Sequence, residues 1–231
     1  MSALAEPLGY ETKFIFPGEA LAPARVIVAA ACRPELPFGS SHVETIYFDG
    51  RGLESLEEKL ASDYHKAKIR LRWYDSAGTV WLEVKRRVGT RREKFRTPLP
   101  IDGRELSRRG LEHPDLVRVP ELLSAHGENA AADLIAVVHL TYRRERFVAA
   151  GSSLRISIDS AIRALEIAPW TERIPGRSQH RPGAGTPFLV EIKGESRDLP
   201  PELRALAVLG GRRGSFSKYS FCLLDEFDPG R

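Results

Sequence analysis

The chain has 231 residues, of which 42% are hydrophobic and 29% charged, and a formal net charge of +4. This balance is typical of a globular protein, so a wholly disordered chain is excluded, and the length suits a single domain spanning residues 1–231. No stretch approaches eighteen consecutive apolar residues, and the first thirty residues do not resemble a secretory leader. We therefore expect no membrane segment and a cytoplasmic location.

The first half of the chain is predicted to form strands separated by short helices. Apolar residues alternate or recur at helical spacing in successive segments, and Pro or Gly residues follow most of these segments. The predicted elements are a strand at 10–16, a helix at 19–32, a strand at 43–49, a helix at 53–60 and strands at 66–74, 79–87 and 92–97. Turn residues separate the last three strands, which we interpret as an antiparallel meander.

The second half is predicted to begin with a helical insertion and then to return to strands. Residues 98–133 are polar with helical spacing, and residues 169–187 are rich in Pro, Gly and Arg without periodicity, which indicates a mobile loop. The remaining predicted elements are strands at 134–149, 154–159, 163–167 and 187–193, and helices at 200–209 and 216–226. Cys32 and Cys222 are expected to be buried, reduced thiols in helical surroundings, because they match no metal-ligand spacing.

Charged residues occupy alternate positions in several of the predicted strands. Lys68, Arg70 and Arg72 share one face of their strand, and Glu83 and Lys85 share one face of the next. Other strand faces of the same kind carry Glu11 and Lys13; Arg92, Lys94 and Arg96; Tyr142, Arg144 and Arg146; Arg155 and Asp159; and Glu191 and Lys193.

One such strand would be an ordinary solvated face of an antiparallel sheet. Here the faces are mostly cationic, and like charges on neighbouring strands repel each other unless an anion lies between them. Each strand also has an apolar face that needs cover. These charged and apolar strand faces together predict an α+β fold, in which an antiparallel β-barrel tunnel has a charged lumen and flanking helices. Such a lumen suits a polyanion.

Short motifs along the chain resemble, in their order, those of the VTC domain. This is the polyphosphate polymerase domain of the vacuolar transporter chaperone, within the CYTH-like superfamily of triphosphate tunnel metalloenzymes. The motifs are YETKF at 10–14, TIYFD at 45–49, KIRLR at 68–72, LEVK at 82–85, YRR at 142–144, LRISID at 154–159, EIK at 191–193 and SKY at 217–219. The resemblance implies a triphosphate tunnel fold that binds ATP or another triphosphate and inorganic polyphosphate, with Mn²⁺ or Mg²⁺ as cofactor.

The resemblance also implies roles for individual residues. The catalytic set comprises Lys13, Arg70, Arg72, Lys85, Arg144, Lys193 and Lys218. Further phosphate-binding residues are Lys68, Lys94, Tyr142, Arg155 and Ser217. Glu191 is the implied metal ligand, whereas Glu11 and Glu83 share the charged faces and either bind metal or pair with basic neighbours. These residue types suit the chemistry, since arginine forks and lysine charges bind phosphate oxygens and a carboxylate holds a hard divalent ion.

The sequence leaves several functions open. An ATP-dependent polyphosphate polymerase is the leading hypothesis, and a tripolyphosphatase or nucleoside triphosphatase is the alternative, because water can replace the polyphosphate end as nucleophile. Members of the hydrolytic branch of the superfamily resemble one another in a Glu-x-Glu-x-Lys motif at the first strand. In this chain Gly9 stands where the first Glu of that motif would be, which favours the VTC-like branch. A non-catalytic polyphosphate-binding module is a third hypothesis. Nucleic-acid binding is not expected, because a closed tunnel excludes duplexes, and the oligomeric state is not specified.

Overall fold

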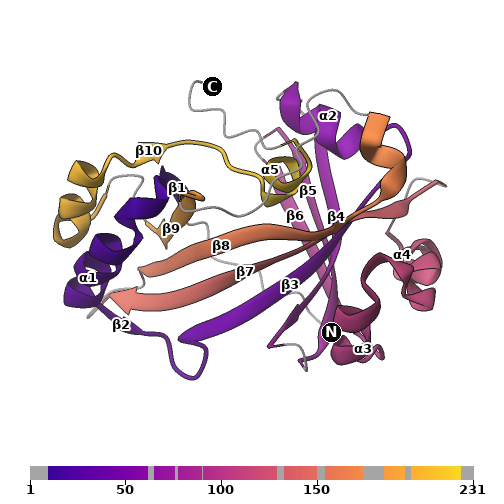
Figure 1. The fold of residues 1–231 in the computed structure, drawn as a ribbon, viewed down its shortest axis with the longest axis horizontal. Coiled ribbons are helices and arrows are strands. Elements are labelled where there is room, and N and C mark those ends of the chain that lie inside the picture. The colour runs from indigo at the N-terminus through magenta and orange to yellow at the C-terminus, as the bar shows by residue number, and fades with distance from the viewer. Residues whose placement is uncertain are drawn as a thin grey trace.

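The computed structural model describes residues 10–61, 65–75, 78–89, 91–128, 133–149, 154–173, 185–195 and 199–224. These residues form one antiparallel sheet of ten strands in the order β10-β1-β9-β8-β7-β3-β4-β5-β6, with β2 paired to β7 (Figure 1). The strands are β1 (Tyr10–Phe16), β2 (Cys32–Pro34), β3 (Ser40–Asp49), β4 (His65–Tyr74), β5 (Val80–Val88), β6 (Arg91–Leu99), β7 (Ile135–Ala149), β8 (Arg155–Ile167), β9 (Phe188–Gly194) and β10 (Arg212–Arg213).

Short helices lie between the strands and at the C-terminal end of the described chain. The α-helices are α1 (Leu21–Ala31), α2 (Glu54–Leu60), α3 (Gly103–Arg109), α4 (Val119–Ala125) and α5 (Lys218–Leu224). The 3-10 helices are η1 (Gly18–Ala20), η2 (Gly110–Glu112), η3 (Pro114–Arg118), η4 (Pro169–Arg173) and η5 (Pro201–Leu209). Within the described residues, no helix is long and apolar enough to cross a membrane.

Four predicted elements differ in detail from the structure. The two strands expected at 154–159 and 163–167 are one strand, β8, which bends where Ala161 takes a positive φ and the register with β7 shifts. Cys32 lies in strand β2 rather than in a helix, although both cysteines are free and buried as expected. The 200–209 segment is the 3-10 helix η5, and β10 was not predicted. Most of the expected loop, residues 174–184, lies outside the described residues.

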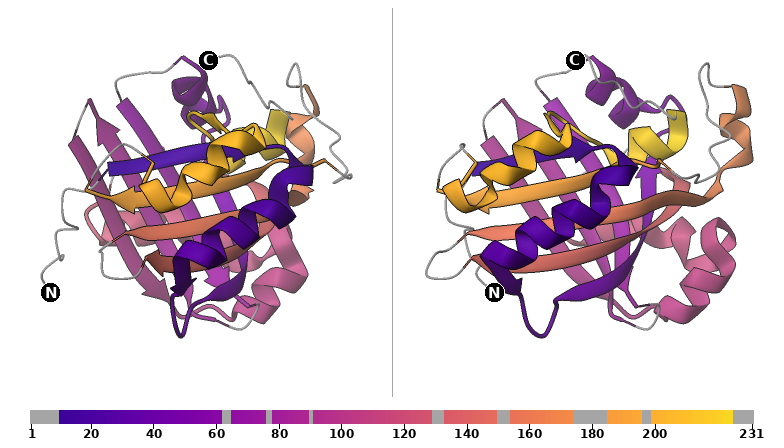
Figure 2. Two further views of the ribbon diagram at one scale, coloured as in Figure 1. Left: turned by 90° about the vertical axis from the view of Figure 1, so that its left-hand side faces the viewer. Right: turned by 60° about the vertical axis from the view of Figure 1, so that its left-hand side comes forward.

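The sheet curls strongly, so that strands distant in the sheet order face one another (Figure 2). Two consecutive residues at the start of α5 demonstrate this, because Ser217 accepts a hydrogen bond from Lys68 on β4 and Lys218 contacts Asp159 on β8. Among the described strands, no pairing joins β6 to β1 or β10, so the curled sheet is a tunnel open along one seam. The charged sequence of β6, RREKFRTPL, disfavours pairing at this edge. The predicted antiparallel tunnel fold is confirmed, without hydrogen-bonded closure.

The outer face of the sheet is apolar and covered by helices. Ile69, Leu71 and Trp73 of β4 are buried in a core that also contains Leu106 of α3 and Leu123 of α4. A second core joins the outer residues of β8 and β9 to α1 and η5. Burial of these side chains stabilises the fold by roughly 25 cal/mol per Å² of apolar surface removed from water. The opposite parity points inward and carries the charged residues, as predicted. The inner face is not purely charged, however, because Ile15, Val43 and Leu189 have this parity and lie in a third core with α5.

Asp49, at the end of β3, joins α2 and α5 to the sheet. Its buried carboxylate accepts hydrogen bonds from the backbone N–H groups of Gly50, Ser55 and Leu56, at 2.9, 2.9 and 3.2 Å. It also accepts one from the hydroxyl of Tyr219 on α5, at 2.8 Å. Because α5 carries Lys218 into the tunnel, this carboxylate positions part of the charged face.

We predict that Asp49→Ala lowers the free energy of unfolding by about 3 kcal/mol or more, because each buried donor left without an acceptor costs about 1–3 kcal/mol. Tyr219→Phe removes a single bond to the same carboxylate and should cost about 1 kcal/mol. Urea unfolding of the two variants beside the unchanged chain measures both losses. Equal losses would show that Asp49 acts through Tyr219 alone.

Candidate functional site

A first cluster of inner-face charges surrounds Glu83 on β5. The register of β4, β5 and β6 sets Arg70 and Arg96 directly opposite Glu83 on either side. Arg70 contacts the Glu83 carboxylate through Nε and Nη2 at 2.8 and 2.6 Å, and Arg96 Nε and Arg72 Nη1 lie 3.3 and 3.6 Å from it. Burial alone would raise the pKa of Glu83, but the attraction of the three arginines outweighs burial and lowers this pKa to about 2. One carboxylate facing three guanidiniums leaves this cluster positively charged.

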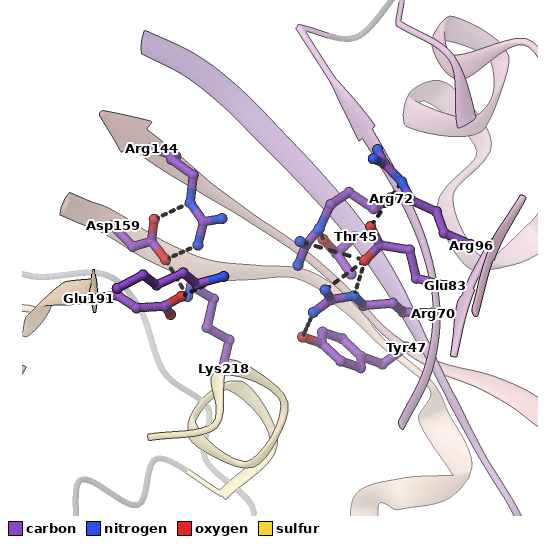
Figure 3. Close-up of polar contacts among 11 residues, drawn as sticks. Thr45, Tyr47, Arg70, Arg72, Glu83, Arg96, Arg144, Asp159, Glu191 and Lys218 are labelled. Carbon is purple, nitrogen blue, oxygen red and sulfur yellow. Dashed lines mark hydrogen bonds and ion pairs between the residues drawn. The ribbon is translucent and has the colours of Figure 1, made fainter. Parts of the chain in front are cut away.

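A second cluster surrounds Asp159 on β8 (Figure 3). Arg144, directly across on β7, donates from Nε and Nη2 to the two carboxylate oxygens, both at 2.6 Å. Lys218 of α5 donates to Oδ2 at 2.6 Å. Burial raises the pKa of Asp159, but Arg144 and Lys218 together hold it well below its usual range. Two cations around a single carboxylate again leave positive charge on the inner face.

Beside this second cluster, β1 and β9 form a lattice of alternating charge. Glu11 pairs across the strands with Lys193, and Lys13 with Glu191. The Lys13 ammonium lies 3.1 Å from Glu11 and 3.6 Å from Glu191, and the Lys193 ammonium lies 3.8 and 3.7 Å from the same carboxylates. Burial raises the pKa of Glu11, yet Lys13, Lys193 and Lys85 lower it to about 2. Despite burial, the pKa of Lys13 is raised by Glu191 and Glu11, and that of Glu191 is lowered chiefly by Lys13, so Glu11, Lys13 and Glu191 are ionised at neutral pH.

Three lysines stand in one row across β4, β5 and β6. Lys68 is paired in register with Lys85, and Lys85 with Lys94. Lys68 donates to Ser217 Oγ at 2.9 Å. Enclosure within the curled sheet and the charges of Arg70 and Arg72 lower the pKa of Lys85 to about 8. Like charges directly opposite each other on neighbouring strands are destabilising, so this row of lysines favours the binding of an anion.

Two tyrosines lie among these cations. The Tyr142 side chain is buried, with Arg144 Cζ 5.5 Å and Lys218 Nζ 4.5 Å from its ring centroid, and its hydroxyl has no hydrogen-bond partner among the described residues. Tyr47, opposite Arg70 in the register of β3 and β4, accepts a hydrogen bond from Arg70 Nη1 at 3.1 Å. Tyr47 was not among the predicted site residues. Only the strand register reveals that it lies beside Arg70.

The structure brings most of the predicted residues together, with one exception. Arg155 pairs in register with Lys193, but its guanidinium is 69% exposed and lies 3.7 Å from the Glu35 carboxylate. The remaining predicted side chains occupy the inner face or the start of α5. They are Glu11, Lys13, Lys68, Arg70, Arg72, Glu83, Lys85, Lys94, Tyr142, Arg144, Glu191, Lys193, Ser217 and Lys218.

The carboxylates differ in their suitability for a divalent metal. Among the described residues, no group of three or more His, Cys, Asp or Glu side chains is arranged to hold a metal. Mg²⁺, however, is commonly held by one or two carboxylates together with substrate phosphates. Glu191 and Glu11 share Lys13 and Lys193 and form such a pair of hard oxygen donors. Glu83 does not fit, because three guanidiniums occupy its carboxylate oxygens.

A family model of the VTC domain matches residues 10–224. The chain belongs to the VTC domain family. No curated protein matches the sequence. Among solved structures, HpAC1 from Hippeastrum, described as having a dominant triphosphatase activity, is 13% identical with a TM-score of 0.52, over 93% of this chain and 94% of that chain. The PH1819 protein from Pyrococcus horikoshii OT3 is 14% identical with a TM-score of 0.47, over 91% and 96% of the two chains.

These comparisons confirm the family that the ordered motifs indicated. The likeness to HpAC1 independently supports the tunnel fold, since it extends over nearly the whole of both chains. Its low identity carries no information on individual residues. The assignment of site residues in this VTC domain therefore depends on the charge geometry described above.

We predict that Glu83→Gln lowers the free energy of unfolding by about 3–5 kcal/mol, because Arg70 and Arg72 then remain buried without a counter-charge. Glu105→Gln is the matched control, since Glu105 pairs with Arg108 and Arg109 at the surface and its replacement should leave the free energy of unfolding nearly unchanged. Tripolyphosphate should raise the melting temperature of Glu83→Gln more than that of the unchanged chain. An equal rise would show that the anion does not reach this cluster.

The same carboxylate makes stability depend on pH. The pKa of Glu83 is about 2 in the folded chain, below its ordinary value of 4.5. Its stabilising contribution is therefore complete above pH 4.5 and is lost as the pH falls toward 2. Unfolding measured across this range should show the difference between the unchanged chain and Glu83→Gln shrinking as the pH falls. A constant difference would contradict the ion-pair explanation.

Proposed function

We propose that this VTC domain is a triphosphate-handling tunnel enzyme that transfers the γ-phosphoryl group of ATP to an inorganic polyphosphate chain. The observation that carries the proposal is the excess of cations on the inner face, around the Tyr142 hydroxyl, which has no hydrogen-bond partner in the part of the chain that the structure describes. A row of fixed positive groups matches a chain with a negative charge on every phosphate. The membership of the VTC domain family supports the same chemistry.

The arginines and lysines have distinct tasks in this proposal. Arg70, Arg72 and Arg144 offer guanidinium forks that bind two phosphate oxygens at once. Lys13 and Lys218, with the remaining lysines of the inner face, supply point charges. In the structure Glu83 and Asp159 hold the three arginines in place. A bound phosphate chain adds a second set of acceptors to groups that are already oriented, which lowers the ordering cost of binding.

Phosphoryl transfer needs little covalent chemistry from the protein. Catalysis rests on alignment of donor and acceptor phosphates and on stabilisation of charge on the transferred group. The fixed guanidiniums do both, because they are oriented before the substrate arrives. Mn²⁺ or Mg²⁺, held by Glu191 with Glu11, would add positive charge against the phosphate oxygens.

Hydrolysis is the second candidate function. The tunnel that aligns a polyphosphate end would also admit water, and a triphosphatase activity is described for HpAC1, which shares the fold. A binding module without catalysis is less well supported, because it needs no carboxylate pair such as Glu11 and Glu191. The products of a single reaction separate these functions.

We predict that the purified chain, incubated with ATP and Mn²⁺ and with a short polyphosphate primer, produces longer polyphosphate and ADP. Gel electrophoresis resolves the polymer, and a phosphate assay measures hydrolysis. Free phosphate without polymer would identify a triphosphatase instead. Binding of polyphosphate without turnover would identify a binding module, and absence of both binding and turnover would reject the proposal.

We further predict that Glu191→Gln abolishes metal-dependent turnover, because the pair of carboxylates is reduced to one. Binding of tripolyphosphate in the absence of metal should be unchanged or tighter, since Lys13 and Lys193 lose a competing acid. Glu105→Gln again serves as the surface control. Unchanged turnover in Glu191→Gln would remove this residue from the metal site.

A further inference from the structure

Tyr47 is a buried tyrosine whose hydroxyl lies beside the cations of the inner face. The side chain is 6% exposed, and its hydroxyl oxygen accepts a hydrogen bond from Arg70 Nη1 at 3.1 Å. Arg70 is itself fixed by Glu83, so it donates to Tyr47 from a defined position (Figure 3). Among the described residues, no acceptor is found for the proton of the Tyr47 hydroxyl. This donor is therefore available to a ligand in the tunnel.

Charged and aromatic groups of β4 and α5 lie around Tyr47. From β4 come Arg70, Arg72 and Lys68, and from α5 comes Lys218, all of which favour the ionised phenol. Tyr219 of α5 stacks on the Tyr47 ring, with centroids 5.4 Å apart and an interplanar angle of 23°. The Glu83 carboxylate is bound to the guanidiniums of Arg70 and Arg72.

We propose that Tyr47 is a substrate-binding residue of the tunnel, whose hydroxyl accepts from Arg70 and donates its proton to a phosphate oxygen of the bound chain. The inference rests on the proposed function and extends it to Tyr47, which lies in the TIYFD motif but received no role from the family resemblance. A hydroxyl that is both acceptor and donor would connect the Arg70 guanidinium to the ligand. It would thereby orient the phosphate relative to the Glu83 cluster.

This role makes binding sensitive to pH. Burial raises the pKa of Tyr47, but the four cations lower it to about 7 in the empty tunnel. Below pH 7 the phenol keeps its proton and can donate. Above pH 7 the phenolate has lost the donor and repels the phosphate, so binding requires uptake of one proton from solvent. Tripolyphosphate should therefore raise the pKa of Tyr47 on binding.

Tyr47→Phe tests the proposal, because phenylalanine preserves the ring stacked on Tyr219 and removes only the hydroxyl. At about pH 6, calorimetry should show metal-free tripolyphosphate binding about tenfold more weakly to Tyr47→Phe than to the unchanged chain, the usual effect of one hydrogen bond to a charged group. The dissociation constant of Tyr47→Phe divided by that of the unchanged chain should fall by up to tenfold per pH unit above about 7, because only the unchanged chain must then take up a proton to bind. This ratio should pass below one at high pH.

The ratio of dissociation constants for Tyr47→Phe and the unchanged chain is insensitive to titration of tripolyphosphate and of Lys85, because both titrations affect the two proteins equally. Tyr219→Phe is the matched control, because it removes the other hydroxyl of the stacked pair. The Tyr219 hydroxyl donates to Asp49, and burial and that carboxylate raise the pKa of Tyr219, so it does not ionise near neutrality. This variant should lose stability but keep the pH profile of the unchanged chain.

A spectroscopic titration gives an independent readout. Near-ultraviolet tyrosinate absorbance of the unchanged chain minus that of Tyr47→Phe should show one ionisation near pH 7, and tripolyphosphate should move it upward. A dissociation-constant ratio that is the same at every pH would overturn the inference, even if the unchanged chain binds tripolyphosphate tightly. Failure of the unchanged chain to bind tripolyphosphate at any pH would instead reject the proposed function.

Discussion

The arrangement of this protein depends on one electrostatic constraint, the confinement of many cations on the concave face of a single sheet. Taking a guanidinium out of water costs several kcal/mol unless an anion or hydrogen-bond acceptors compensate. Glu83 and Asp159 compensate Arg70, Arg72 and Arg144 in the absence of ligand. Because each carboxylate is outnumbered by cations, the compensation is incomplete. The face therefore retains affinity for a polyanion.

The rest of the fold supports this unfavourable interior from outside. Apolar side chains of β4, β5, β8 and β9 point outward under α1, α3, α4 and η5 and form two cores on the outer face. A third core joins α2 and α5 to the sheet and includes Tyr47 and Tyr142, which lie beside the charges. Helix α5 is the exception, since it enters the curled sheet. Asp49 holds it from behind through Tyr219, while Lys218 and Ser217 extend from its first turn to β8 and β4. This helix therefore connects the two halves of the charged face.

Much of this organisation was predictable from the sequence, and the limits have physical causes. Strict alternation identified which residues of each strand point inward, because side-chain parity is a local property of a strand. The pairing of Arg70 with Glu83, and the place of Tyr47 beside them, depends on register between strands, which alternation does not determine. The prediction of two separate strands within β8 was wrong, because an irregularity at Ala161 shifts the register with β7 without ending the strand.

The acids of the inner face explain how a tunnel can bind a polyanion without holding it permanently. A purely cationic surface would gain its full Coulomb energy from the ligand and release the product slowly, since affinity is adjusted mainly through dissociation. Under the proposed function, a departing phosphate would leave Arg144 paired with Asp159 and Arg70 paired with Glu83, so the empty state is already stabilised. The same pairs keep each guanidinium oriented between ligands. If the proposed function holds, acid and base together suit a site through which a phosphate chain moves.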